Sequence, residues 1–439
     1  METVAETSIL HKLADEKLES IPGILKSIRK DAFRTLQIVR FPTRKDEDWR
    51  FTDLKPITRT DFTHPEEAGI EPAGDLSEYF IPESSESRIV FINGEFSREN
   101  SSIDSIPEGV TIQNLYENLE DKTVGKYLNT LADYPEDVFV PFNSLHFTDG
   151  AFIHIGEDVD AGAPIQILNV YTNSDKPFVA TPRVLVIAER GANATIVEDH
   201  IGLAGNTYMT IPVGEFKLKE GSHLHHIRLV RDSVNAVHVS RPISYLEKHA
   251  EYHSYTITLG AGLSRNEPKV IMEDEEVKFT VDGLVLIDGN QIADTHSTLD
   301  HRFSHAESHQ LHKVVVNGSA HSIFNGKIFV QRNAQKIDSF QENRNLLLSI
   351  DGKVNTKPQL EIFADDVLCS HGATIGQLDP EEVFYLQSRG MTEQKAKEVL
   401  TYAFALETIE NIEVESVHRL LIDEVKKYTE ANNVSKVTA

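Results

Sequence analysis

The sequence has only one cysteine, Cys369, among its 439 residues. A single thiol cannot form a disulfide within the chain, and it excludes a metal site built from cysteines alone. No apolar run approaches the roughly 20 residues that a membrane-spanning helix needs. The acidic N-terminus lacks the basic and apolar regions of a signal peptide. These absences predict a soluble, cytoplasmic protein.

Positive charge is also scarce, because 43 Lys and Arg residues stand against 69 Asp and Glu residues, a net charge of −26. A surface this acidic repels phosphate backbones and anionic lipids, so we expect neither a nucleic-acid nor a membrane partner. Apolar residues make up 40% and charged residues 26% of the chain. This balance is ordinary for a globular protein, and it predicts a sizeable core.

Motifs of common enzymes are missing as well. The sequence has no Gly-x-x-x-x-Gly-Lys-Ser/Thr phosphate loop, no Gly-x-Ser-x-Gly elbow and no His-Glu-x-x-His zinc motif. The first absence excludes a P-loop ATPase, and the other two remove frequent hydrolase classes. We therefore expect a protein that is not an enzyme.

Helical periodicity is concentrated near the two ends of the chain. Residues 8–38 predict helix with a break at Pro22-Gly23, and residues 57–85 predict irregular structure. Between about 148 and 368, short β-branched runs alternate with Gly, Asn, Asp and Ser turns. This pattern predicts three parts: a largely helical N-terminal subdomain, 1–147; a β core, 148–378; and a C-terminal helical subdomain, 379–439.

A weak repeat runs through the β region. A polar turn leads into an alternating strand at residues 190–196, 220–226, 248–254 and 317–323, and Gly191 and Gly221 are 30 residues apart. Repeated strands without helical crossovers indicate a β-solenoid, in which each coil covers the edge of its neighbour. A β-sandwich or a double-stranded β-helix barrel fits the pattern about equally well.

Capping signals define the C-terminal helices. Asp379 with Pro380 predicts a helix start, Gly390 a left-handed helix end and Thr392 a second start. One apolar face is expected on each of the last two helices. The residues on these faces are Ala396, Val399, Leu400, Ala403 and Phe404, then Val414, Val417, Leu421 and Val425.

Several segments of the chain carry recognisable motifs. They are the C-terminal segment Cys369-Ser-His-Gly-Ala-Thr-Ile-Gly-Gln-Leu-Asp379 with residues 384–390 after it, the N-terminal segment Glu47-Asp-Trp-Arg-Phe-Thr-Asp-Leu54 and the central residues 315–328. Together they resemble the motifs of the SufB/SufD family of iron–sulfur cluster assembly proteins, and the C-terminal segment, which resembles the family's C-terminal signature, is the strongest match. The resemblance covers nearly the whole chain.

The resemblance implies a mainly β fold, a right-handed parallel β-helix flanked by N-terminal and C-terminal helical subdomains. It also implies a heterodimer with SufB, binding of the SufC ATPase, and a homodimer when the chain is isolated. SufB-type chains carry an acceptor cysteine in the stretch that matches residues 349–355, and this chain has none there. The missing cysteine favours the SufD branch of the family. The resemblance then implies a scaffold subunit with a role in the entry of iron into the complex.

Two residues of the signature are the candidates for cluster assembly at the SufB interface. His371 is the first, because a neutral imidazole is a suitable iron ligand and titrates near physiological pH. Cys369, two residues earlier, would point to the same side of a strand, although a lone cysteine is usually a small core residue. No stably bound cofactor is expected, only a transient iron–sulfur cluster or iron. The expected SufC contacts are Phe384, Tyr385, Arg389, Val399, Leu400 and Phe404.

The N-terminal motif holds Trp49 and Phe51, which predict either a hydrophobic anchor for the N-terminal helices or a partner contact. Histidine is plentiful, with 19 in the chain, and two groups stand out. They are His223, His225 and His226, and then His296, His301, His305, His309, His312 and His321. Their spacing fits no closed metal site, so surface positions are favoured.

Two alternative functions stay open, a β-helix carbohydrate-active enzyme and a stand-alone histidine-based metal-binding protein.

Overall fold

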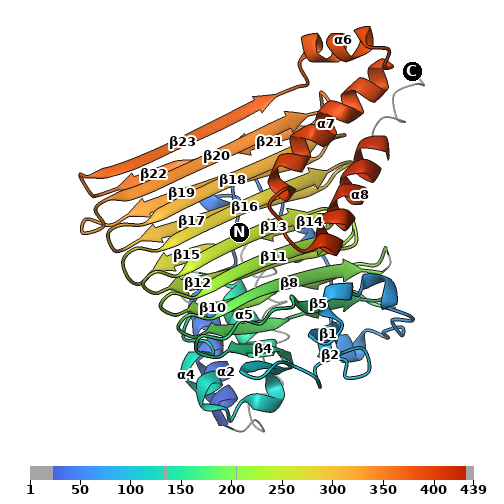
Figure 1. The fold of residues 1–439 in the computed structure, drawn as a ribbon. Helices are drawn as coiled ribbons and strands as arrows, with labels where there is room; N and C mark the ends of the chain where they lie inside the picture. Colours follow the sequence, from blue (N-terminus) through green and yellow to red (C-terminus); the bar gives the residue numbers. More distant parts are fainter. Residues whose placement is uncertain (1–22, 133–136, 204, 432–439) are drawn as a thin grey trace.

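The computed structural model describes residues 23–132, 137–203 and 205–431, which form a parallel β-solenoid with N-terminal and C-terminal helices packed outside it (Figure 1). Two sheets face each other along the solenoid, one of ten strands and one of thirteen. Successive coils pair in parallel and in register, so that β8 lies beside β11 and β11 beside β13. The solenoid predicted from the repeat is therefore confirmed, and the sandwich and barrel alternatives are wrong.

The ten-stranded sheet runs in the order β2 (Glu95–Phe96), β1 (Arg88–Ile92), β5 (Ile165–Tyr171), β8 (Asn193–Gly202), β11 (His223–Arg231), β13 (Glu251–Thr258), β16 (Lys278–Ile287), β18 (Glu307–Val316), β20 (Ile337–Leu347) and β23 (Val367–Gly376). The main path of the thirteen-stranded sheet is β21 (Lys353–Thr356), β19 (His321–Val330), β17 (Ile292–His301), β14 (Leu263–Asn266), β12 (Val237–Leu246), β10 (Val213–Leu218), β7 (Arg183–Ala188), β4 (Gly150–Ile155) and β3 (Val110–Asn114). Strands β15 (Lys269–Met272), β22 (Gln359–Ile362), β6 (Phe178–Ala180) and β9 (Tyr208–Thr210) complete it.

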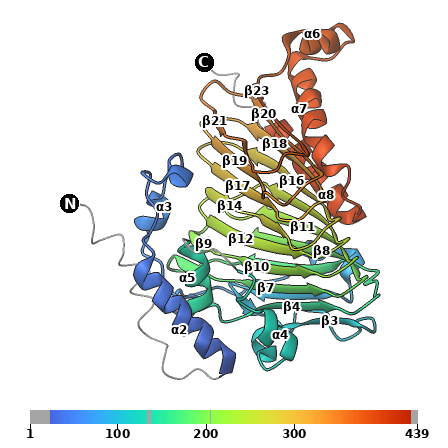
Figure 2. The ribbon, with the colours of Figure 1, turned by 90° about the vertical axis from the view of Figure 1, so that its left-hand side faces the viewer.

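The helices lie outside the solenoid. The N-terminal ones are α2 (Gly23–Ile38), α3 (Lys55–Thr58), α4 (Lys122–Tyr127) and α5 (Phe139–His146), with 3₁₀ turns at Glu47–Trp49, Pro65–Glu67, Ser77–Tyr79, Pro82–Ser84 and Tyr116–Asn118. The C-terminal ones are α6 (Pro380–Ser388), α7 (Glu393–Ile409) and α8 (Glu415–Ala431). Figure 2 shows α2, α3 and α5 on the side of the solenoid opposite to α7 and α8. The expected helix over 8–38 is present from Gly23, and residues 8–22 lie outside the described residues.

Left-handed turns cause the repeat seen in the sequence. Gly191, Gly221 and Gly318 have φ angles of 67°, 64° and 59°, and His249 takes the same conformation with φ 58°. This region favours glycine because it lacks a Cβ. The Gly191 N–H donates to Glu220 O of the next coil at 2.9 Å, and the Gly221 N–H donates likewise to Lys248 O. The turns thus stack as the strands do.

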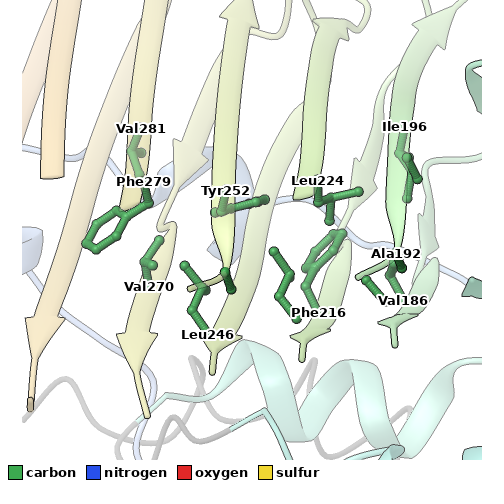
Figure 3. Close-up of a cluster of buried hydrophobic side chains, with 14 of the residues drawn as sticks. Val186, Ala192, Ile196, Phe216, Leu224, Leu246, Tyr252, Val270, Phe279 and Val281 are labelled. Atoms are coloured by element: carbon green, nitrogen blue, oxygen red, sulfur yellow. The ribbon is translucent and has the colours of Figure 1, made fainter. Parts of the chain in front are cut away.

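Apolar side chains fill one part of the lumen between the two sheets. Leu224, Tyr252 and Phe279 occupy the same row on successive strands of the ten-stranded sheet. Phe216 and Leu246 are buried in the same cluster from the thirteen-stranded sheet (Figure 3). Burial of each such side chain contributes about 1.5–3 kcal/mol, which holds adjacent coils together.

The N-terminal motif is attached to the thirteen-stranded sheet through Trp49. Its ring stacks on Phe139 with centroids 5.6 Å apart, and the Arg265 guanidinium lies 3.9 Å from its ring centre. Arg265 also donates to Asp48 O at 2.7 Å. Trp49 is therefore an anchor for the N-terminal segment, whereas Phe51 is exposed.

Helices α7 and α8 cover the outer face of the ten-stranded sheet (Figure 2). Asp379 accepts a hydrogen bond from Glu381 N, Thr392 accepts one from Lys395 N, and Gly390 has φ 95°, which confirms the predicted caps. The predicted face of α8 is buried, but that of α7 is only partly correct because Ala403 is exposed. The buried residues of α7 are instead Ala396, Glu398, Thr401, Ala405, Thr408 and Ile409. Several are small, which lets the helix lie close to its neighbours.

Strands β1 and β3 come from the part of the chain in which mainly helix was expected. β1 pairs in parallel with β5, and β3 pairs antiparallel with β4, so both extend the solenoid sheets toward the N-terminus. The subdomain boundaries at 147/148 and 378/379 stay predictions. No helix in the described ranges combines the length and the apolar character required to cross a bilayer.

Candidate functional site at the open end of the solenoid

The signature segment forms β23, the last strand of the ten-stranded sheet. It pairs in parallel with β20 on one side, and no further strand of the described residues follows it in the order of that sheet. Its residues are mostly exposed, unlike those of the inner strands. The unpaired backbone groups of such an edge are ready to bind another strand.

Apolar side chains accompany this open edge. Leu368 on β23 is 74% exposed and Ile350, in the turn before β21, is 86% exposed. Phe363 and Ile375 are also large, apolar and exposed. Exposed apolar groups gathered at the end of a solenoid indicate a surface that a partner covers, because they would otherwise contact water. We call Ile350, Phe363, Leu368 and Ile375 the terminal apolar group.

Cys369 and His371 lie on the lumen-facing side of β23. In the register with β20, Cys369 is opposite Ser339, and His371 is opposite Gln341. Ser339 and Gln341 are fully buried, so these positions point into the solenoid. The two candidate residues therefore share one face of the strand, as the i, i+2 spacing predicts.

Each candidate continues a row of polar side chains inside the solenoid. Ser339 is hydrogen-bonded to Ser308 at 2.7 Å. Gln341 donates to Gln310 at 2.7 Å, and Gln310 in turn donates to Ser297 of the opposite sheet at 2.8 Å. The row Gln310, Gln341 and His371 thus leads from the buried lumen to the exposed end.

The two candidate side chains differ in accessibility. His371 is exposed, so its imidazole can reach a metal ion or a partner. Cys369 is a free, half-buried thiol that packs against the apolar lumen cluster. Burial, reinforced by the negative charge of Asp338, raises the pKa of the Cys369 thiol. This favours the thiol over the reactive thiolate and suits a packing role.

The two histidine groups divide between the faces of the strands. His226, His301 and His312 are buried inside the solenoid. Others lie on the outer faces or in turns: His223, His225, His296, His305, His309 and His321. Within the described part of the chain, no three His, Cys, Asp or Glu side chains are placed to hold a metal ion.

A buried charged network in the lumen was missed in the sequence. Glu198 is hydrogen-bonded to His200 at 2.8 Å and to His226 at 3.1 Å, and Arg228 Nε lies 3.8 Å away. Burial opposes the charge of Glu198, yet the hydrogen bonds from both histidines and the charge of Arg228 hold its pKa well below the usual range. The sequence shows polar residues at alternate positions of β8 and β11, Glu198 and His200 and then His226 and Arg228, but this alternation does not say which face points inward.

The expected SufC contacts are only partly free. Phe384, which is 69% exposed, and Tyr385 and Arg389 lie on the outer side of α6, where the Arg389 guanidinium is 5.2 Å from the Tyr385 ring centre. Val399 and Leu400 are half-buried on α7. Phe404 packs toward the sheet, with Lys313 Nζ 4.6 Å from its ring centre. The free apolar surface of this tail is therefore concentrated on α6.

Comparisons with known families identify the chain's relatives. Residues 170–404 match the family described as "SUF system FeS cluster assembly, SufBD core domain", and residues 10–167 match "SufBD protein N-terminal region". These two matches cover the solenoid together with most of the N-terminal part and end within α7.

Individual proteins align over most of their length. An iron–sulfur cluster assembly SufBD family protein of Synechocystis is 35% identical over 406 residues, 90% of this chain and 89% of the relative. The iron–sulfur cluster assembly protein SufD of Escherichia coli is 29% identical over 87% of this chain and 88% of its own. The chloroplastic protein ABCI7 of Arabidopsis thaliana is 30% identical over 92% and 85%.

Proposed function

This chain belongs to the SufBD family of the SUF system for iron–sulfur cluster assembly and is SufD-like, and we propose that it is a non-catalytic scaffold subunit. In this role it pairs with a SufB-type protein and binds a SufC-type ATPase. The observation that supports the proposal best is the open end of the solenoid, where the signature strand β23 is unpaired on one side and carries exposed apolar residues.

The SufB-type partner adds its own strands to β23. Backbone pairing extends the ten-stranded sheet into the partner, and the terminal apolar group is buried at the same time. His371 then lies in the interface between the two proteins. In this position it contacts iron or a nascent cluster. The iron enters through the interface and is transient cargo, not a resident cofactor.

The isolated chain uses the same edge for a homodimer. Two copies of an identical strand edge can pair about a twofold axis, which forms a closed interface with the same residues on both sides. The homodimer and the heterodimer therefore compete for β23.

The SufC-type ATPase binds the C-terminal helices, mainly α6. Phe384 and Tyr385 supply exposed aromatic rings beside the Arg389 guanidinium, a combination frequent in the energetic centres of interfaces. Deletion of all C-terminal helices would be a poor test, because α7 and α8 also cover the apolar outer face of the ten-stranded sheet. Substitutions on α6 separate binding from stability.

Co-purification with the two partners tests the proposal. Leu368→Asp is expected to abolish recovery of the SufB-type protein, and Phe384→Asp is expected to abolish recovery of the SufC-type ATPase. Val234→Asp is the control, because Val234 is exposed in a loop far from both surfaces. Full recovery of both partners by the first two variants would refute the proposed interfaces, and measurable turnover of a substrate by the pure chain would refute a non-catalytic role.

A further inference from the structure

A small pocket lies at the other end of the solenoid from β23, where α2 and α5 meet the loop after α3 and the β1–β2 turn. Figure 1 shows α2 and α5 near the N-terminal coils, with β23 and α6 at the opposite end. The pocket has a volume of about 40 Å³. Arg29, His64, His146, Asn93, Thr148 and Thr181 are among the residues that line it.

Arg29 is the unusual member of this pocket. Its residue is only 7% exposed, and one of its nitrogens, Nη2, donates to Phe147 O at 2.9 Å. Its Nε is buried and has no hydrogen-bond partner among the residues that the structure describes. Burial lowers the pKa of the Arg29 guanidinium, and the electrostatic interaction with Tyr116 opposes this shift in part. A buried positive charge normally has a carboxylate partner, and none stands beside Arg29 among the described residues.

The other arginines buried in the solenoid show what is missing. Arg183 forms an ion pair with Glu215 at 2.5 Å, and Arg265 forms one with Asp294 at the same distance. Arg241 lies 2.7 Å from Asp137. In the described ranges no acidic side chain stands in the corresponding place beside Arg29. Because these three arginines are paired, the exception points to a partner other than the residues that the structure describes.

The walls of the pocket suit an oxygen-rich anion. The His64 and His146 ring centroids lie 5.4 Å apart, and both residues line the same pocket as Arg29. Thr148 and Thr181, whose side chains carry hydroxyl groups able to donate, also line it. Two carboxylates, Glu66 and Glu95, also line the pocket, but both are exposed at its rim, where water screens them.

The size of the pocket limits the ligand. One buried water occupies roughly 10–15 Å³ on the same measure, so the pocket has room for about three waters. Groups of this size include phosphate and a simple carboxylate, whereas a nucleotide would not fit. We propose that this pocket binds a small oxyanion, held by Arg29 with the help of His64 and the threonine hydroxyls.

A purely structural role for Arg29 makes a different prediction. Phe147 is the C-cap of α5, and a cation near a helix C-terminus is favoured by the helix dipole. If this were the whole role, loss of the charge would lower stability but would have no connection with any anion. Ligand binding therefore decides between the two interpretations.

The experiment is calorimetric titration of the full chain with inorganic phosphate and, separately, with acetate. Sodium chloride at matched ionic strength controls for screening of surface charge. Saturable binding of either oxyanion supports the proposal, and the better probe distinguishes a tetrahedral from a planar ligand. Arg29→Met is expected to weaken this binding at least about tenfold, because a charge-assisted hydrogen bond is lost. Arg34→Met, an exposed change on the same helix, should leave it unchanged.

Two outcomes would overturn the proposal. One is the absence of saturable binding of both probes to the unmodified chain, a result that does not depend on any variant folding. The other is equal affinity in the chain with Arg29→Met and in the unmodified chain. Should Arg29→Met fail to fold, His64→Gln replaces it, with a smaller but measurable loss of affinity expected.

Discussion

His371 on β23 lies directly beside Gln341 on β20, as the exposed last member of a polar row that is otherwise buried. Gln341 donates to Gln310, and both amides are enclosed between the sheets. His371 has the same orientation but no following coil to cover it. A partner that pairs with β23 would enclose it and give it the environment that Gln341 already has.

His371→Ala is expected to impair cluster assembly without changing the fold or partner binding. The side chain is exposed, so its loss should change the free energy of unfolding by no more than about 0.5 kcal/mol. Cluster formation by the reconstituted complex is the measurement, with His309→Ala as a matched exposed histidine on β18. Wild-type cluster yield with His371→Ala would remove this residue from the mechanism.

Much of the fold could be predicted because its signals are local. The left-handed turns at Gly191 and Gly221 recur once per coil, and Asp379 and Thr392 cap their helices as the sequence indicates. The open end could not be predicted from composition or periodicity. A strand becomes an edge only because no coil follows it, so β23 looks like its neighbours until the topology is known.

The polar lumen was missed for a different reason. The alternation of polar and apolar residues along a strand identifies its inward face only when the other face is exposed to solvent. Strand β11 is buried on both faces, because α7 and α8 cover its outer side. His226 and Arg228 therefore could not be placed in the lumen from the pattern alone. His225, one residue away, points outward instead.

Gly283→Ala is expected to destabilise the solenoid by about 1–3 kcal/mol. A Cβ at this position would lie 2.3 Å from Nδ1 of His312 on the next coil, and the buried ring stacks on Phe324 and cannot easily move away. Urea unfolding measures the effect. Gly125→Ala is the control, since a Cβ there meets nothing within 4 Å. Equal stability of the two variants would show that the lumen adapts to the extra methyl.

Asp282 should make the protein less stable as the pH rises toward neutrality. Burial raises its pKa to about 6, while Leu311 N donates to its carboxyl at 2.8 Å. The pKa of Asp282 in the folded protein lies above the unfolded value near 3.9. The stability that the protonated carboxyl provides is therefore fully present below about pH 4 and is lost as the pH rises through 6. Asp282→Asn keeps the acceptor and should stabilise the fold by about 1–3 kcal/mol at pH 7 but little at pH 4.

Unfolding measurements at pH 4 and pH 7 check this sign. Asp338→Asn is the control, because Asp338 is exposed on the neighbouring part of the same sheet. A stabilisation by Asp282→Asn that is the same at both pH values would contradict the titration and indicate a packing effect.

His312 should have the opposite dependence on pH. Burial lowers the pKa of His312 to about 3, so folding excludes the proton that the unfolded chain binds below about 6.5. Its contribution to stability is complete above 6.5 and falls as the pH decreases, by about 2 kcal/mol between pH 7 and pH 5. His312→Gln should reduce the acid loss by this amount, whereas His309→Gln, exposed on the same strand, should not.

The last prediction concerns the contacts of Lys313 that attach α7 to the ten-stranded sheet. Lys313 is buried at its side chain, donates to Phe404 O at 2.9 Å and forms an ion pair with the half-exposed Glu407. Glu407 also lies 3.1 Å from Arg344. Burial lowers the pKa of Lys313, and the hydrogen bond from Lys313 lowers the pKa of Glu407.

Glu407→Ala leaves Lys313 buried without its carboxylate and should destabilise the attachment of α7 by about 1–3 kcal/mol. Lys313→Met fills the same space without a charge, so its effect should be smaller despite the loss of the same ion pair. Hydrogen exchange of the α7 amides measures local opening, and Glu410→Ala, exposed at the end of α7, is the control. If Lys313→Met opened α7 more than Glu407→Ala, the other contacts of Lys313 with Phe404 would hold the helix, and the unpaired lysine would not be the source of the penalty.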